Sequence, residues 1–230
     1  MPALAEQLHR KLQAHGDPVV AAGQFAYMKE IQPFRGVKAP LRRRLLRDAL
    51  AEYPLRDESD FEGNVLELWR GKYREERLLA LDLSARSKQF RDEARPLFER
   101  LLAEADWWDV LDPLASDLLG GALRKYPELL AKKIRVWRKS PHLWTRRAAL
   151  LVQLKYRQQT DHDLLAETIL MLADEKDFFI RKAIGWILRE YAKTSPDWVN
   201  RFVRGNEQIL SALSRREALR RMSADNNKRS

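Results

Sequence analysis

Apolar residues recur with a helical period along nearly the whole chain. In 106–124 a core stripe is formed by positions at i, i+4, i+7 and i+11, namely Trp107, Leu111, Leu114 and Leu118. No stretch of useful length alternates apolar and polar residues with the period of two that a strand requires. We therefore predict an all-α protein.

Proline and aspartate place many of the expected helix starts, because Asp caps a helix and Pro fits its first turn. A second helix is expected to start at Asp17-Pro18, and a very basic one at Pro40. The other helices are expected at 3–14, 58–69, 74–86, 90–104, 106–124, 127–138, 141–158, 161–173, 177–193 and 196–204, with a last short one from about Ser214.

The helices repeat at a step of roughly 35 residues, which is the size of a HEAT-like helix pair. One row of equivalent positions is charged throughout: Arg77, Asp112, Arg147, Lys182 and Glu217. Another is apolar: Leu79, Leu114, Ala149 and Ile184. Stacked helix pairs form an α-solenoid with a concave face. The alternative is an irregular helical bundle, but the register runs from 73 to 217 without insertions and favours the solenoid.

Equivalent positions of a solenoid line up on one surface. The row therefore predicts a cationic ladder along the concave face, at Arg77, Arg147 and Lys182, which could follow a phosphate backbone. Asp112 is the exception in this ladder, because a carboxylate repels phosphate. This exception is the best internal sign of chemistry.

Composition supports a polyanionic partner. The 230 residues include 43 Lys and Arg against 33 Asp and Glu, for a formal net charge of +10. Such a charge favours nucleic acid first and an anionic membrane surface second, although a merely basic protein is an alternative. We expect one domain over 1–222 and a disordered basic tail over 223–230. The absence of cysteine, of a signal segment and of a long apolar run predicts a cytoplasmic protein that does not enter a membrane.

Two tryptophans lie beside charged residues and off the core stripes. Trp108 and Asp112 are four positions apart on one helix face, and Trp186 lies between Lys182 and Arg189. Both rings could simply fill seams between repeats. However, aromatic faces attract cations, and a carboxylate can stabilise positive charge or position water. The set suits cleavage of a glycosidic bond in a nucleic acid, through an oxocarbenium-like transition state. A single candidate carboxylate indicates a leaving group that needs no general acid, such as an alkylated, cationic base.

Metal and cofactor chemistry is not predicted. The four histidines are scattered, with no ligand pair at helical spacing, and no glycine-rich phosphate loop is present.

Several stretches resemble the AlkD-type DNA alkylation repair family, the HEAT-like-repeat DNA glycosylases of bacteria. They are 107–112 (WWDVLD), 143–149 (LWTRRAA), 153–156 (QLKY), 178–193 (FFIRKAIGWILREYAK) and 27–36, with Tyr27-Met28-Lys29, Pro33-Phe34 and Gly36. The resemblance implies a monomer that removes N3- and N7-alkylated purines from double-stranded DNA without a cofactor and without base flipping.

The resemblance also implies roles for single residues. Asp112 would stabilise the oxocarbenium and place the water, while Trp108 and Trp186 would hold the sugar and backbone of the lesion. The implied DNA contacts are Arg147, with a phosphate, and in support Tyr27, Lys155, Lys182 and Arg189.

One departure from the family pattern is Pro113, directly after Asp112. An Asp-Pro step could make Asp112 the cap of a helix that begins at 113, or Pro113 could kink a continuing helix. Two functional alternatives remain open: a non-catalytic HEAT-like module that binds nucleic acid, and a protein-binding scaffold.

Overall fold

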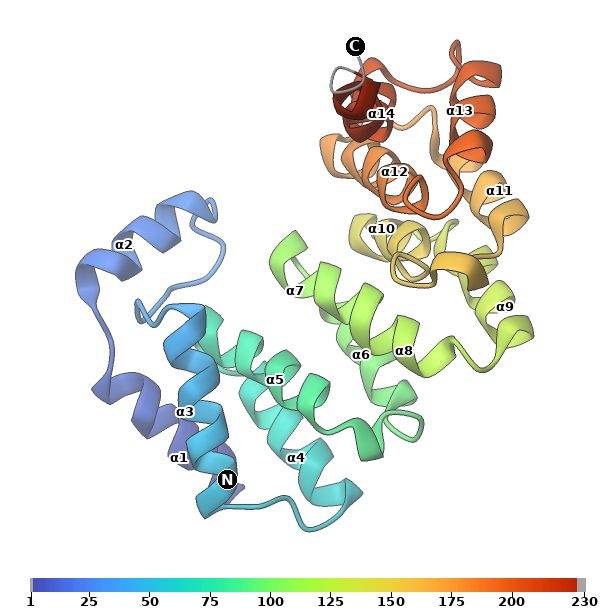
Figure 1. The fold of residues 1–230 in the computed structure, drawn as a ribbon. Coiled ribbons are helices and arrows are strands. Elements are labelled where there is room, and N and C mark those ends of the chain that lie inside the picture. Colours follow the sequence, from blue (N-terminus) through green and yellow to red (C-terminus); the bar gives the residue numbers. More distant parts are fainter. Residues whose placement is uncertain (1, 227–230) are drawn as a thin grey trace. The chain divides into compact units, whose positions relative to one another are not determined.

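The computed structural model describes residues 2–226, and these contain helices and connecting turns but no strand (Figure 1). The prediction of an all-α protein is confirmed. The chain divides into two compact units, Met1–Leu97 and Phe98–Ser230, and the division falls within helix α6 (Arg95–Glu104).

The described part of the first unit holds five α-helices and the short 3₁₀ helix η1 (Lys88–Phe90). The α-helices are α1 (Ala3–Ala14), α2 (Pro18–Tyr27), α3 (Ala39–Glu52), α4 (Glu58–Trp69) and α5 (Arg74–Arg86). Helix α1 packs on α3 and α4, and α5 packs on the same two helices. Leu8, Leu46 and Phe61 form part of the core between them. Helix α2 contributes no fully buried residue.

The loop between α2 and α3 is held by a buried carboxylate. Glu75, at the start of α5, accepts hydrogen bonds from the backbone N–H groups of Arg35, Gly36 and Val37 at 2.9–3.1 Å. Gly36 has a φ of +85°, and a Cβ there would lie 2.0 Å from the carbonyl oxygen of Asp17, so only glycine fits this turn. These hydrogen bonds hold the loop between α2 and α3 against the start of α5.

The second unit stacks helix pairs. Its elements are α7 (Trp108–Pro113), the π-helix η2 (Leu114–Leu119), α8 (Gly120–Leu123), α9 (Pro127–Trp137), α10 (Leu143–Leu151), η3 (Arg157–Gln159), α11 (His162–Leu172), α12 (Phe178–Tyr191), α13 (Pro196–Gly205) and α14 (Ala212–Asn226). Helix α10 packs on α7 and η2, α12 on α10, and α14 on α12, while α9, α11 and α13 cover their outer sides. This stacking confirms the predicted solenoid-like arrangement of helix pairs. The concave face stays a prediction.

The repeat register is visible in the starts of the inner helices, which fall at Arg74, Trp108, Leu143, Phe178 and Ala212. The apolar row Leu79, Leu114, Ala149 and Ile184 is at most 2 % exposed. The row predicted to be core is therefore core in both units.

Three predicted boundaries were wrong. The helix expected at 90–104 begins at Arg95, after η1 and a turn. The helix expected at 141–158 ends at Leu151, because Gln153 turns inward and its amide bonds the backbone of Asp161. The last helix continues to Asn226 and so includes the first residues of the predicted tail, while 227–230 lie outside the described residues.

Candidate active site

A bidentate ion pair joins Asp112 on α7 to Arg147 on α10. Arg147 Nε donates to Asp112 Oδ1 at 2.8 Å, and a terminal nitrogen donates to Oδ2 at 2.9 Å. The other terminal nitrogen donates to the carbonyl oxygen of Phe179 at the start of α12, at 2.5 Å. The side chain of Arg147 is 4 % exposed and that of Asp112 is 14 % exposed. One guanidinium thus links three successive inner helices.

An aromatic cluster lies at the same helix starts. The rings of Trp107, Trp144 and Phe179 meet pairwise at 5.0–5.5 Å between centroids. Phe178 extends the cluster toward solvent, because it is 57 % exposed and its ring lies 5.4 Å from that of Phe179. These ring contacts hold Phe179 in the first turn of α12, and the carbonyl oxygen of Phe179 accepts a hydrogen bond from Arg147. The aromatic cluster therefore helps to position Arg147 for its ion pair with Asp112.

Pro113 does not make Asp112 a helix cap. Trp107 is the N-cap of α7, Asp112 lies inside that helix, and the chain continues into the π-helix η2. Proline has no N–H to donate back along the helix, and a wider π turn follows it. Ser116 Oγ donates to the carbonyl oxygen of Asp112 at 2.8 Å. Trp108 and Asp112 therefore keep their four-residue spacing on one α-helical face.

The environment of Asp112 acts on its acidity in opposing directions. Burial is the largest influence and raises the pKa of the Asp112 carboxyl above its ordinary value, and the nearby charge of Asp109 raises it further. The hydrogen bonds and the charge of Arg147 lower it. The net direction is upward. The ionised form of Asp112 depends on Arg147.

Trp186 lies on α12 beside an ion-paired cluster. Glu217 of α14 pairs with Lys182 at 2.7 Å and also with Arg189, so both cations around Trp186 have a partner inside the protein. These contacts lower the pKa of the Glu217 carboxyl. Trp186 itself is half-buried, as is Trp108. Both rings thus keep part of their surface open to a ligand.

In the second unit the cations of the predicted ladder are ion-paired, and their contact with phosphate remains a prediction. The ladder positions form two ion pairs, Asp112 with Arg147 and Lys182 with Glu217, and Glu217 also binds Arg189. Opposite charges one repeat apart lie on adjacent packed helices, so they neutralise each other. The guanidinium of Arg147, expected at a phosphate, has its partners inside the protein. Each cation of the row has a carboxylate one repeat away, Asp112 for Arg147 and Glu217 for Lys182, and this spacing could have indicated the pairing.

The two remaining predicted DNA contacts are more accessible. The side chain of Lys155 is 55 % exposed and its ammonium pairs with Asp117 of η2. Tyr27 lies in the first unit, where it ends α2, and it is 72 % exposed.

Sequence reasoning missed the support that Trp144 and Phe179 give to this site. Each has the apolar character of an ordinary core residue, so residue type alone does not separate them from the core.

Within 2–226 no group of three or more His, Asp or Glu side chains is arranged to hold a metal ion. In the same residues no helix is long and apolar enough to cross a bilayer.

The fold and the site define a class: an all-helical repeat protein with a carboxylate held by an arginine and a half-buried tryptophan one turn before that carboxylate on the same helix. The family model for the DNA alkylation repair enzyme matches residues 8–222. The chain belongs to this family.

The solved structures similar to the chain include two bacterial proteins. A predicted DNA alkylation repair enzyme from Enterococcus faecalis is 31% identical, with a TM-score of 0.80 over 89% of this chain and 95% of the other. The smu.31 protein of Streptococcus mutans UA159 shares the fold, at 17% identity and a TM-score of 0.61, over 94% of this chain and 98% of the other. A comparison with curated proteins found no match.

Proposed function

We propose that this protein is a DNA glycosylase that hydrolyses the N-glycosidic bond of cationic N3- and N7-alkylated purines in double-stranded DNA. Membership of the DNA alkylation repair enzyme family supports a repair role on DNA. The observation that carries the glycosylase proposal is the Asp112 carboxylate, held on both oxygens by Arg147 and still 14 % exposed.

The proposed reaction requires few catalytic groups from the protein. The C1′–N bond breaks, its electron pair stays on the purine nitrogen, and the alkylated base leaves as a neutral molecule. The sugar becomes an oxocarbenium ion, to which water adds at C1′ with loss of a proton to solvent. A general acid is not needed because the leaving group already carries positive charge. The protein has to stabilise a cation and position a water.

Asp112 is proposed to do both. Its negative charge lies in a partly desolvated setting, where electrostatic stabilisation of a cation is stronger than in water. Arg147 is a positioning residue, because its fork fixes both oxygens and keeps the carboxyl ionised against burial. Without Arg147 the raised pKa would favour a neutral acid, which could not stabilise the sugar cation.

Trp108 and Trp186 are proposed to contact the sugar and backbone of the damaged nucleotide. Trp108 shares the helix face of Asp112, and both rings are half-buried, so each is positioned and still accessible. An aromatic face attracts a cation, which would favour the oxocarbenium and the alkylated base. In this proposal the base is released without moving into a pocket.

A second candidate function is a non-catalytic DNA-binding module. The observation that favours it is the same ion pair. The hydrogen bonds of Arg147 to Asp112 and to Phe179 join α10 to α7 and α12, so the ion pair could have a purely structural role. The two functions differ in what the carboxylate is needed for.

The test compares wild type, Asp112→Asn and Asp109→Asn for release of 7-methylguanine and 3-methyladenine from methylated duplex DNA. Asp109 is the matched control, since it is a carboxylate on the same helix outside the ion pair with Arg147. We expect Asp112→Asn to lower single-turnover release by roughly 10²-fold or more, with DNA affinity kept, and Asp109→Asn to stay active. Equal release by wild type and Asp112→Asn would reduce Asp112 to a structural role. No release by wild type, with DNA bound, would support the binding module.

A further inference from the structure

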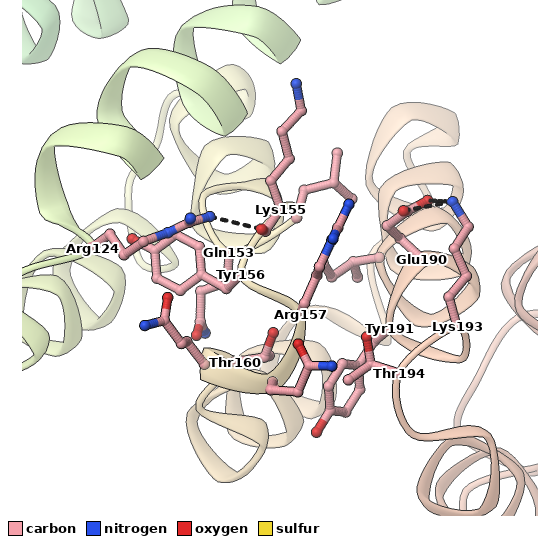
Figure 2. Close-up of a pocket in the computed structure, with 14 residues that line it drawn as sticks. Arg124, Gln153, Lys155, Tyr156, Arg157, Thr160, Glu190, Tyr191, Lys193 and Thr194 are labelled. Carbon is pink, nitrogen blue, oxygen red and sulfur yellow. Dashed lines mark hydrogen bonds and ion pairs between the residues drawn. The ribbon is translucent and has the colours of Figure 1, made fainter. Parts of the chain in front are cut away.

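A cationic groove lies in the second unit, where the loop after α10 faces the C-terminal part of α12 (Figure 2). Its volume is about 930 Å³. Four cations line it, Arg124, Lys155, Arg157 and Lys193, against one carboxylate, Glu190. The lining therefore favours an anion.

Three of these cations have partners inside the protein. Arg124 donates to the carbonyl oxygen of Lys155 at 2.7 Å, and its guanidinium lies 4.7 Å from the centre of the Tyr156 ring. Lys155 pairs with Asp117, and Lys193 with Glu190 at 2.6 Å. The pairing with Lys193 also offsets the carboxylate that would otherwise repel an anion.

Arg157 differs from the other three. It is exposed, and no hydrogen bond or ion pair joins its guanidinium to another residue among those whose side chains the structure describes, 2–220. Figure 2 shows its side chain extending into the groove, between Lys155 and Glu190. The guanidinium of Arg157 is therefore available to an anion from outside the protein.

The backbone holds Arg157 in an unusual conformation. Its φ is +55°, in the left-handed region that a residue with a Cβ seldom adopts. The loop is closed on both sides of it. The Gln153 side chain bonds the backbone of Asp161 at 2.8 and 3.4 Å, and the Tyr156 hydroxyl donates to the carbonyl oxygen of Gly120 at 2.8 Å. These hydrogen bonds hold the loop in the conformation in which the side chain of Arg157 extends into the groove (Figure 2).

We propose that Arg157 binds a phosphate of the DNA backbone, and that this groove carries the strand away from the Asp112 site. This inference rests on the proposed function for its location. Residues that line the groove lie close in sequence to the site residues, or pair with a helix next to them. Glu190 lies on α12 one turn after Trp186, and Lys193 lies two residues past the end of that helix. Lys155 pairs with Asp117 of η2, which directly follows α7. A guanidinium fork matches two phosphate oxygens, and this explains an arginine here.

The experiment measures the affinity of the full chain for undamaged duplex DNA as a function of salt. Arg157→Asn removes the charge but tolerates the left-handed conformation, so the loop should fold as before. Arg157→Lys keeps the charge. The matched control is Arg135→Gln, because Arg135 is an exposed arginine on α9 outside the groove.

For Arg157→Asn we expect the log–log salt slope to become shallower by roughly 0.9, the value for one phosphate contact. Affinity at low salt should fall by roughly tenfold. Arg157→Lys should keep the slope, and Arg135→Gln should behave as wild type. An unchanged slope for Arg157→Asn, with an unchanged melting temperature, would overturn the proposal. So would an equal change of slope for Arg135→Gln.

Two further measurements, binding of inorganic phosphate and release of the alkylated base, separate a DNA contact at Arg157 from a simple anion site and from the glycosylase activity. If Arg157→Asn loses binding of inorganic phosphate but keeps the DNA slope, the groove is an isolated anion site and the DNA assignment is wrong. Base release at saturating protein should fall by roughly 10²-fold or more in Asp112→Asn and stay at the wild-type rate in Arg135→Gln. An Arg157-dependent slope in a protein that releases no base would support this inference while contradicting the glycosylase.

Discussion

Arg147 donates to both carboxylate oxygens of Asp112, at 2.8 and 2.9 Å, across two packed helices. The pair is nearly buried, so its two charges depend on each other more than a surface pair would. This dependence leads to predictions on stability and on pH.

Removing Arg147 should destabilise the second unit. Arg147→Met leaves a mostly buried carboxylate without its partner and frees the carbonyl oxygen of Phe179, at an expected cost of about 3 kcal/mol. The double variant with Asp112→Asn should cost less than the sum of the two single changes. Urea unfolding of the four proteins measures this. Additive costs would contradict an energetic coupling between the two side chains.

The pH dependence of base release should follow the Asp112 carboxyl. Burial raises its pKa, and only the ionised form stabilises a sugar cation, so release should fall as pH is lowered through that raised pKa. Arg147 lowers the pKa, so Arg147→Met should move the inflection to higher pH. Asp109 raises it, so Asp109→Asn should move the inflection to lower pH. Single-turnover rates, corrected for spontaneous depurination, test both signs. Shifts in the same direction would contradict this electrostatic account.

Gly185 should not tolerate a side chain. A Cβ there would lie 2.4 Å from Cβ of Glu217 and 2.9 Å from the carbonyl oxygen of Ser214, so Gly185→Ala must push α12 away from α14. We expect a loss of about 1–3 kcal/mol in unfolding free energy. Gly23→Ala is the control, because no atom lies within 4 Å of its added Cβ in α2, and it should be neutral or stabilising by about 0.5–1 kcal/mol. Equal effects of the two substitutions would show that close packing is not the cause.

Glu217 should contribute to stability in a pH-dependent way. Its hydrogen bonds to Lys182 and Arg189 lower its pKa below the unfolded value of 4.5. A carboxyl with a depressed folded pKa stabilises fully above the unfolded pKa, and loses that contribution as pH falls through the folded one. The difference in unfolding free energy between wild type and Glu217→Gln should therefore be constant above about pH 5.5 and shrink below about pH 4.5. A gap that grows on acidification would reverse the sign and refute the assignment.

Tyr27 tests whether the first unit takes part in DNA binding. The residue is 72 % exposed at the end of a helix with no fully buried residue, so Tyr27→Ala should leave the melting temperature unchanged. If the ring contacts DNA, affinity for duplex should fall by several-fold, roughly 1 kcal/mol. Val19→Ala on the same helix, with an 81 % exposed side chain, is the control. Unchanged binding by Tyr27→Ala would remove it from the interface.

The sequence by itself determined the helical class, most helix boundaries and the repeat register, because these depend on local periodicity, caps and equivalent spacing. Equivalent spacing alone predicts that the apolar row of Leu79, Leu114, Ala149 and Ile184 is core, and all four side chains are buried. The placing of Asp112 one turn after Trp108 followed in the same way, since residues four apart share a helix face.

Tertiary structure alone decided how the charges pair. By sequence Arg147 is a cation available to phosphate, and Lys182 and Arg189 are further DNA contacts, but packing brings Asp112 and Glu217 against them. The loop that holds Arg157 in a left-handed conformation is closed by a hydrogen bond between Gln153 and Asp161 and by one from Tyr156 to Gly120, which is 36 residues away from Tyr156. Hydrophobic periodicity records which face of a helix is buried, but a charge is neutralised or free according to the neighbour that packing supplies.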